Sequence, residues 1–342
     1  MKSTIKDVAK KAGVSIATVS LVISDNDRIS TETKKKVLKV IKSLNYYPSR
    51  SARDLVSKKT GNIGFILTDD HFLRTEPFYT RIFLGTEYEA RDGNYYILLT
   101  TVQSNYSKND PLPRFVLDRS VDGIIIAGKV PNTLIERIVE QKIPIVFVDY
   151  TSHANCCSQI LIDNIDGGIL ATDHLIQLGH KNIGFIGGDI NHPSISDRLN
   201  GYKQALGKAG IKPKDNLIII DAEYPDRQNG YKSAAKLFTK NKNVTALFAC
   251  NDAMAIGAIH YLKDNGYKIP EDVSVIGFDD VEADLMLEPP LTTIRVPKFE
   301  LGVEALRAMI NYLNNKSNTK KILVPVELIL RKSTKIFNNK KS

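Results

Sequence analysis

Residues 4–20 read TIKDVAKKAGVSIATVS, and this stretch decides how the amino-terminal part of the chain folds. The apolar residues between Ile5 and Ala12 recur three and four positions apart, which predicts a short amphipathic helix. Gly13 can adopt the left-handed conformation that ends a helix, and Ser15 can accept a hydrogen bond at the start of the next one. The stretch therefore predicts two short helices joined by a three-residue turn.

The residues around this stretch complete a three-helix unit. Thr4 and Asp7 have the spacing of a capping box at the start of the first helix. A second helix is expected over residues 16–24, and a third over residues 30–44 with Ser30 as its N-cap. The third helix is expected to bury one stripe, formed by Val37, Leu38, Ile41 and Leu44. Such a unit indicates a helix-turn-helix, whose second helix enters the major groove of DNA.

The net charge of the chain lies entirely in this segment. The chain has 342 residues and a net charge of +9. Residues 1–60 carry 14 Lys and Arg against five Asp and Glu, whereas the other 282 residues hold 33 groups of each sign. A strongly basic end on an otherwise neutral protein indicates nucleic acid or an anionic surface as its partner.

The stretch at residues 4–20 resembles the DNA-binding signature of the LacI/GalR family of bacterial transcription regulators at almost every position. The resemblance implies that the second helix reads bases mainly through Ile16, Ala17 and Leu21. Leu21 can offer only apolar contact, for example to a thymine methyl group, so neighbouring side chains and DNA shape are expected to share the readout. The expected DNA-contacting residues of this unit are Ser15, Ile16, Ala17, Thr18, Ser20 and Leu21.

Residues 44–55, LNYYPSRSARDL, resemble the hinge of the same family. Pro48 ends the third helix, and a short hinge helix is expected after it. The resemblance implies that this helix folds when it pairs with its twin in the DNA minor groove, where Leu55 is wedged between base steps. Arg50 and Arg53 are expected to contact phosphates.

From residue 62 onward, apolar runs alternate with helical stretches, which predicts parallel strands buried on both faces. The expected strands are Ile63–Leu67, Tyr96–Leu99, Gly123–Ile126, Ile145–Val148, Ile160–Ile162, Ile183–Ile186, Leu217–Ile220, Ala246–Ala249 and Val273–Phe278. The expected helices are Phe83–Arg91, Gly167–Leu178, Arg198–Ala209, Asn229–Thr239 and Ala253–Asn265. With crossovers near residues 160 and 291, these elements predict two doubly wound α/β lobes and a ligand cleft at the carboxyl ends of their strands.

Polar residues follow several of these strands. Asp149, Asn251 and Asp279 each stand at a strand end, Arg198 is expected to open a helix, and Asp252 is expected to cap one. Carboxylates and a guanidinium suit vicinal hydroxyl groups or the edge of a heterocycle, and aromatic rings can cover the apolar side of such a ligand.

The body is also similar to the effector-binding core of the LacI/GalR family, which resembles periplasmic sugar-binding proteins. The resemblance covers about residues 4–333. By match to the family's pocket, the expected ligand-binding residues are Arg198, Asp279, Asp149, Asn251, Tyr224, Phe78 and Tyr79. The loop at residues 68–77 is longer than in most relatives and is expected at the pocket mouth or the dimer face.

Several classes of protein are excluded by what the sequence lacks. No stretch approaches the roughly 20 apolar residues of a transmembrane helix, and the amino terminus lacks a secretory signal. The three cysteines, at positions 156, 157 and 250, have neither a disulfide framework nor metal-ligand spacing. Because no nucleophile-and-base motif occurs either, we expect a cytoplasmic protein that is not an enzyme and has no metal or cofactor.

The sequence therefore predicts an all-α helix-turn-helix head over residues 1–47, a hinge helix and linker over residues 48–60, and a periplasmic-binding-protein-like core over residues 61–342. The expected function is a homodimeric regulator, preferably a repressor, that binds a pseudo-palindromic DNA operator. A small ligand in the interlobe cleft controls its operator affinity. A sugar is the preferred effector, a purine or a phosphorylated carrier protein is the alternative, and a ligand-binding protein without a DNA role is the rival that the basic head disfavours.

Overall fold

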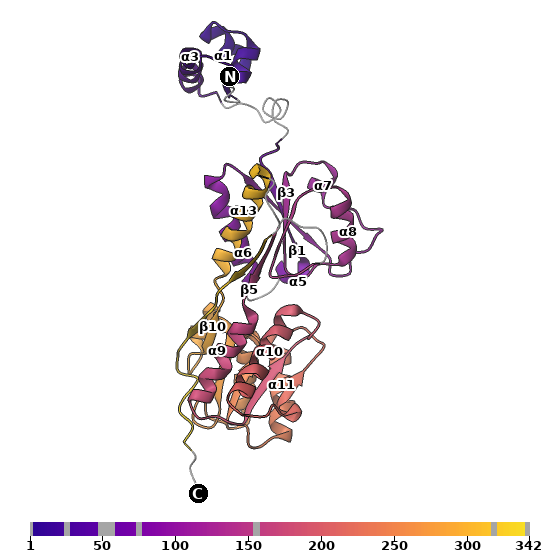
Figure 1. Cartoon of the computed structure of the whole chain (residues 1–342), viewed down its shortest axis with the longest axis vertical. Helices are drawn as coiled ribbons and strands as arrows, with labels where there is room; N and C mark the ends of the chain where they lie inside the picture. Colours follow the sequence, from indigo (N-terminus) through magenta and orange to yellow (C-terminus); the bar gives the residue numbers. More distant parts are fainter. Residues whose placement is uncertain are drawn as a thin grey trace. The chain divides into compact units, whose positions relative to one another are not determined.

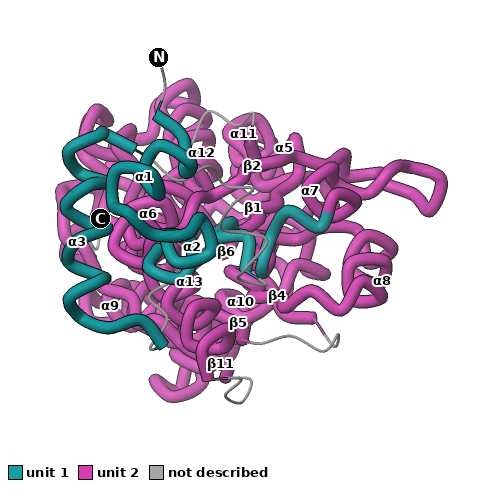
Figure 2. The backbone as a smooth tube through the Cα atoms, turned by 90° about the horizontal axis from the view of Figure 1, so that it is seen from above, with its two compact units in different colours: residues 1–62, 119–122 teal, residues 63–118, 123–342 magenta. Residues whose placement is uncertain are grey.

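The computed structural model describes residues 3–23, 28–46, 59–72, 77–152, 158–315 and 320–338. The chain forms two compact units, residues 1–62 with 119–122, and residues 63–118 with 123–342 (Figure 2). Residues 48–58 of the expected hinge, which include Arg50, Arg53 and Leu55, lie outside the described residues.

The first unit contains the helix-turn-helix that the sequence predicts. Helix α1 spans Ile5–Ala12, α2 spans Ile16–Ile23, and α3 spans Thr31–Ser43. A capping box starts α1, because the Thr4 N–H donates to Asp7 Oδ2 at 2.8 Å while the Thr4 side chain accepts from the Asp7 N–H. The local chemistry of the sequence therefore sets where α1 begins.

The turn between α1 and α2 also has the conformation that its residues predict. Gly13 has a φ of 65°, in the left-handed region that a residue with a β-carbon disfavours. Ser15 Oγ accepts a hydrogen bond from the Thr18 N–H at 3.0 Å, which satisfies one of the unpaired N–H groups at the start of α2.

The three helices share one small apolar core, which contains Val8, Ala9, Ala12, Val19, Val22, Val37 and Tyr46. The prediction that Leu38 belongs to this core is wrong, because 53% of its surface is exposed. Val37 is followed on the same helix face by Val40, Ile41 and Leu44, all partly buried. This spacing of three, four and seven positions places Leu38 about 100° away from the buried stripe.

The described part of the second unit contains two six-stranded sheets, one in each lobe (Figure 1). Lobe 1 has the strand order β11-β5-β4-β3-β1-β2, and its pairings from β11 to β1 are parallel. Its strands are β1 (Asn62–Thr68), β2 (Tyr96–Val102), β3 (Gly123–Ala127), β4 (Ile145–Val148), β5 (Ser158–Ile162) and β11 (Lys320–Val324).

Lobe 2 has the strand order β12-β10-β9-β8-β6-β7, and β12 runs antiparallel to β10 at one edge. Its strands are β6 (Ile183–Gly187), β7 (Ile218–Ile220), β8 (Ala246–Ala249), β9 (Ser274–Asp279), β10 (Thr292–Arg295) and β12 (Glu327–Ile329). Together with the helix-turn-helix, the two parallel-sheet lobes confirm the predicted fold class.

The chain crosses between the lobes at three places. It leaves lobe 1 after Ile162, returns after Arg295, and crosses again at residues 325–326, between β11 and β12. The first two crossings lie close to the expected positions. The sequence analysis missed the third, because β11 and β12 are only five and three residues long and carry no long apolar run.

Three pairs of helices pack against the sheets: α6 (Phe78–Asp92) with α13 (Lys298–Asn315), α9 (Asn164–Gln177) with α10 (Pro193–Lys208), and α11 (Arg227–Lys240) with α12 (Asp252–Asp264). Their backbones approach so closely that only glycine fits at the crossing points. A β-carbon at Gly302 would lie 1.9 Å from the carbonyl oxygen of Ile82, and one at Gly257 would lie 1.9 Å from that of Arg227.

Shorter helices complete the fold: α5 (Asp69–Phe72), α7 (Arg114–Leu117), α8 (Asn132–Glu140), and the 3₁₀ segments η1 (Asp215–Leu217) and η2 (Glu282–Met286). Among the described residues, no helix is both long enough and apolar enough to span a bilayer.

Candidate functional site

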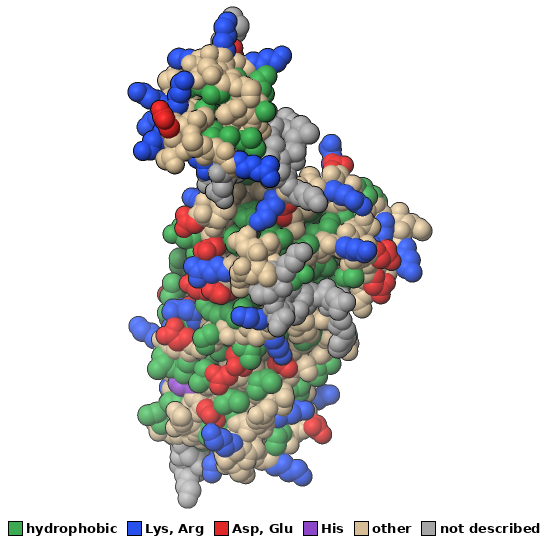
Figure 3. All heavy atoms as spheres, turned by 45° about the horizontal axis from the view of Figure 1, so that its top comes forward, with side chains coloured by type: hydrophobic (Ala, Val, Ile, Leu, Met, Phe, Trp, Pro, Cys, Tyr) green, Lys and Arg blue, Asp and Glu red, His purple; other side chains and the backbone are tan. Residues whose placement is uncertain are grey.

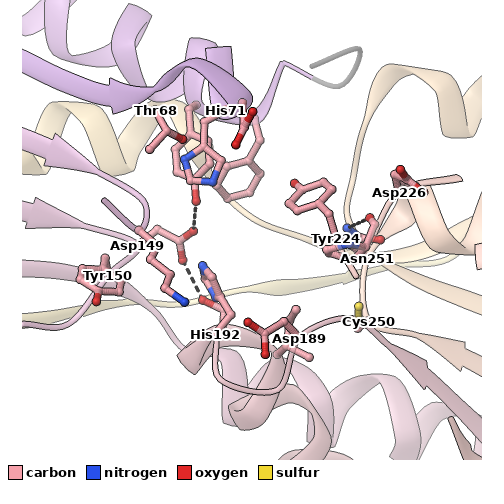
Figure 4. A pocket seen from close by; sticks show the side chains of 18 of the residues that line it. Thr68, His71, Asp149, Tyr150, Asp189, His192, Tyr224, Asp226, Cys250 and Asn251 are labelled. Carbon is pink, nitrogen blue, oxygen red and sulfur yellow. Dashed lines mark hydrogen bonds between the residues drawn. The ribbon is translucent and has the colours of Figure 1, made fainter. Parts of the chain in front are cut away.

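A cavity of about 980 Å³ lies between the two lobes, and residues from the strand ends of both sheets line it. Its wall contains every residue that the sequence predicted for ligand binding, namely Phe78, Tyr79, Asp149, Arg198, Tyr224, Asn251 and Asp279. Figure 4 shows Tyr224, Asp226 and Asn251 on one side of this cavity, and His71, Asp149 and Tyr150 on the other. Parallel strands end at a common edge, so residues far apart in the sequence meet there.

Arg198 is held rigidly in the cavity wall, with 5% of its surface exposed. Its Nε donates to Asn164 Oδ1 at 2.8 Å, and its Nη1 donates to the Cys250 carbonyl oxygen at 2.6 Å. Its Nη2 lies 3.5 Å from Asp279 Oδ1, and its guanidinium stacks on Phe278, 3.6 Å from the ring centroid. Protein acceptors thus bind Nε and Nη1 of the guanidinium group. The remaining nitrogen, Nη2, faces Asp279 and the cavity.

The prediction that Arg198 opens its helix is wrong. Helix α10 begins at Pro193, whose fixed φ suits the first turn of a helix and whose missing N–H needs no partner there. The earlier start adds Ser194 and Ile195 to the cavity wall.

Asp149 connects the two lobes through its carboxylate. It follows β4 with a φ of 54°, an uncommon backbone conformation that is found at binding sites when the surroundings enforce it. Its Oδ2 accepts from the Tyr79 hydroxyl of lobe 1 at 2.9 Å, and its Oδ1 accepts from the Ser194 hydroxyl of lobe 2 at 3.0 Å. Because this carboxylate is buried, both hydrogen bonds are protected from competing water.

We expect Ser194→Ala and Tyr79→Phe each to lower the free energy of unfolding by about 1 kcal/mol, because each removes one donor to a buried carboxylate. Of these two hydrogen bonds, only the one from Ser194 joins the two lobes. Without ligand, Ser194→Ala alone is therefore expected to open the lobes and raise the radius of gyration in small-angle scattering. Equal scattering from both variants and the parent chain would contradict this role for Ser194.

The three aromatic residues predicted for the wall come from two places. Phe78 and Tyr79 are the first residues of α6, which begins five positions before the expected Phe83. The rings of His71 and Tyr79 lie 4.4 Å apart, centroid to centroid. Tyr224 is 46% exposed in lobe 2 and presents its ring toward the cavity (Figure 4).

The head presents a second candidate site on α2. Ser15, Ile16 and Ala17 are exposed at the start of this helix, and Ile16 keeps 45% of its surface in solvent although it is apolar. Thr18, Ser20 and Leu21 are half-buried on the same helix. Lys and Arg side chains gather over the surface of the head with few acidic groups among them (Figure 3). An exposed helix start on a basic head suits the major groove of DNA.

Comparisons with known proteins identify the family of both parts of the chain. Residues 4–49 match the model of the bacterial regulatory proteins of the lacI family, and residues 172–334 match that of the periplasmic binding protein-like domain. The transcriptional repressor PurR of Haemophilus influenzae (strain PittEE) is 35% identical over 340 residues, covering 97% of this chain and 99% of the repressor. This chain belongs to the LacI family. It is a transcriptional regulator, as its relatives are, and not an enzyme.

Solved structures of LacI-family regulators share the fold over nearly the whole chain. The transcriptional regulator CelR in complex with cellobiose has a TM-score of 0.73 and 29% identity, with coverage of 97% of this chain and 100% of CelR. The lac repressor dimer bound to operator and the anti-inducer ONPF has a TM-score of 0.77 and 26% identity, with coverage of 98% and 100%.

Two further acids, Asp252 and Asp280, lie near the cavity wall in other roles than ligand binding. The prediction that Asp252 caps α12 is wrong: Asn251 is the cap, and its Oδ1 accepts from the Met254 N–H at 2.9 Å. Asp280 does not line the cavity, because Arg295 and Arg331 bind its carboxylate. Burial by itself raises the pKa of Asp280, but hydrogen bonds from these two arginines outweigh it and lower the pKa below its usual value.

The structure adds cavity residues to this LacI-family regulator that the sequence analysis did not select. Lys129 follows β3 and Asp189 follows β6, so the strand-end criterion that selected Asp149 would have found both. No sequence signal indicates His71, in the short α5, or His192, in the loop before α10. Burial lowers the pKa of His192, although the charge of Asp149 opposes the shift.

Proposed function

We propose that this LacI-family regulator acts as a homodimeric repressor, and that a sugar in the interlobe cavity controls its affinity for a pseudo-palindromic operator. The observation that carries the proposal is the cavity itself, in which Asp149 accepts hydrogen bonds from both lobes and Arg198 faces Asp279. A ligand bound there contacts both lobes at once, so its binding free energy can change their relative orientation.

The charges of the cavity wall favour an uncharged polyhydroxyl ligand. Its described acids are Asp70, Asp149, Asp189, Asp226 and Asp279, and its described permanent cations are Lys129 and Arg198. This excess of carboxylates repels phosphates, whereas sugar hydroxyls can donate to carboxylates and accept from the guanidinium. Aromatic faces such as that of Tyr224 can cover the apolar side of a sugar ring.

The relatives support a sugar as effector, and they also support a purine. The similar CelR structure contains cellobiose, which agrees with a saccharide as effector here. The name PurR keeps a purine as the alternative, and a phosphorylated carrier protein stays a further one. The proposed binding to an operator does not depend on which of these effectors is correct.

Thermal unfolding against a panel of neutral saccharides, sugar phosphates, nucleosides and purines tests the effector. We expect a neutral saccharide to raise the unfolding midpoint, because a ligand that binds only the folded state stabilises it by mass action. The same saccharide is expected to leave the midpoint of Arg198→Ala unchanged. A rise with a purine alone would replace the sugar by the alternative effector.

Measuring operator affinity at several salt concentrations tests the proposed DNA binding. We expect the logarithm of the operator association constant to fall linearly with the logarithm of salt concentration, by about 0.9 for each phosphate that a Lys or Arg neutralises. Two basic heads on one operator predict a steep slope. A flat slope would contradict phosphate contacts by residues 1–60.

A further inference from the structure

A pair of buried carboxyl groups lies directly behind the cavity wall. Asp252 and Asp284 have no exposed surface, and the Oδ2 atoms of both side chains accept a hydrogen bond from the same backbone N–H. An ionised carboxylate can only accept, so a hydrogen bond between two carboxyl groups requires a proton on one of them. No N–H or O–H donor of the described residues reaches Asp284 Oδ1, so a shared proton would satisfy a buried oxygen.

Both carboxyl groups meet at one backbone group of the wall. The N–H of Val281, a cavity residue, donates to Asp284 Oδ2 at 2.9 Å and to Asp252 Oδ2 at 3.2 Å. Thr293 Oγ1 donates to Asp252 Oδ1 at 2.6 Å and fixes this carboxyl group from the other side. Two fully ionised groups converging on one N–H would repel each other.

Arg331 lies near the pair but is shared with other acceptors. Arg331 lies 3.8 Å from Asp284 Oδ2, but it also binds Asp280 and the Leu291 carbonyl oxygen. Within the described residues, Asp252 has no ion pair. Burial and the charge of Asp284 raise the pKa of Asp252 well above its usual value. Burial likewise raises the pKa of Asp284 to about 6, although the Val281 N–H and Arg331 oppose the shift.

The remaining charged groups face the adjoining acids rather than the pair. Arg198 faces Asp279, whose charge further disfavours ionisation of Asp252. Arg295 binds Asp280. Lys298 donates from α13 of lobe 1 to the backbone carbonyl oxygens of Asp279 and Asp280. None of these contacts neutralises the pair directly.

The segment that the pair supports has an unusual backbone. Asp279 has a φ of 118° and Asp280 a φ of 57°, in regions that non-glycine residues adopt only when their surroundings enforce it. Val281 is the next residue, and its N–H donates to both Asp252 and Asp284. These two hydrogen bonds connect the carboxyl pair to the segment Asp279–Val281. Asp279 carries the carboxylate that faces Arg198 in the cavity.

We propose that Asp252 and Asp284 share one proton, and that this proton holds the wall segment Asp279–Val281 in its ligand-binding shape. The two acids are thus positioning residues, and the shape of the cavity depends on pH. Loss of the proton as pH rises leaves two buried negative charges, whose repulsion is relieved when the Val281 N–H and the Asp279 carboxylate move. The link to ligand binding rests on the proposed function, but the proton sharing does not.

The test compares the full-length parent chain with Asp284→Asn, both without ligand. In the parent chain the pair retains a proton at pH values where the unfolded chain, with an ordinary carboxyl pKa near 4, has lost it. The contribution of the pair to stability is therefore greatest at low pH and falls as pH rises from about 4 through 6. Asn cannot ionise, so the unfolding midpoint of the variant is expected to fall less over this range.

Amide exchange and chemical shift of Val281 provide a local readout. In the parent chain we expect the Val281 amide shift to titrate above the usual carboxyl range near pH 4, and its exchange rate, corrected for intrinsic pH dependence, to rise about tenfold, which corresponds to one pKa unit. In Asp284→Asn both effects are expected to disappear. A Val281 amide that does not titrate in the parent chain, or titrates equally in the variant, would overturn the proposal.

Glu282→Gln is the matched control. It removes one negative charge from the same 3₁₀ segment, but the Glu282 side chain is 82% exposed and pairs with Arg81. We expect this control to keep the parent titration of Val281. Should Asp284→Asn fail to fold, carboxyl ¹³C titration of the parent chain gives the answer directly, because a shared proton produces an Asp resonance that titrates above the usual range. A saccharide panel without a hit would refute the proposed effector and leave these titrations unaffected.

Discussion

Arg198→Ala is expected to abolish the effect of the effector on operator affinity, while operator affinity without effector stays within a few-fold of the parent value. The side chain is buried, binds Asn164 and the Cys250 carbonyl oxygen, and presents its remaining edge to Asp279 and the cavity. Its loss removes the cation that would fix a ligand in place. An electrophoretic mobility shift titration, with and without the saccharide found by thermal screening, measures both quantities.

The same substitution is expected to lower the free energy of unfolding by about 3 kcal/mol, because removing one member of a buried ion pair leaves the other uncompensated. Arg198→Lys separates charge from shape: it keeps the cation but loses the planar fork. We expect this variant to regain stability without regaining the effector response. Arg91→Ala, at a well-exposed arginine on α6, serves as control. A normal effector response in Arg198→Ala would refute the role of Arg198 in the cavity.

Ile16→Glu is expected to reduce operator affinity at least about 100-fold without destabilising the head. Ile16 lies at the exposed start of α2, where the family resemblance and the helix-turn-helix geometry both predict a contact with DNA. A carboxylate there would meet the phosphate backbone and base-edge acceptors at close range. Fluorescence anisotropy with operator DNA measures the affinity, and thermal unfolding shows whether the head remains folded.

Leu38→Glu is the control for this prediction. It makes the same chemical change in the same head at a residue that is 53% exposed on α3. Its long-range effect on the net charge is identical, so we expect only a several-fold loss of operator affinity, removed by added salt. Equal losses in both variants would mean that α2 does not read the DNA, and that the head attracts DNA by charge alone.

Most features of the helix-turn-helix could be predicted from local sequence patterns. The capping box of Thr4 and Asp7 and the turn at Gly13 involve residues within a few positions of each other, so the sequence contains nearly everything that defines them. Leu38 is the exception in this region. Both Leu38 and Val40 are apolar, and only the packing of α3 against the other helices decides which of them is buried.

The cavity illustrates both the success and the limit of strand-end reasoning. Asp149, Asn251 and Asp279 were predicted because a polar residue after a buried strand is readable from the sequence, and the structure brings all three to one cavity. Ser194 was not predicted, because its position depends on where α10 begins. His71 was missed because α5 has four residues and no periodicity to reveal it.

By itself, the sequence determined the three helices of the head, the alternation of strands and helices in the body, the concentration of charge in residues 1–60 and the family to which the chain is similar. Only the tertiary structure decided which polar groups share partners. It shows Asp149 between two lobes, Arg198 hydrogen-bonded to Asn164 and Cys250, and Asp252 and Asp284 at one backbone N–H. The physical reason is that burial and charge coupling depend on groups brought together from distant strands, whereas capping and periodicity act within a few residues.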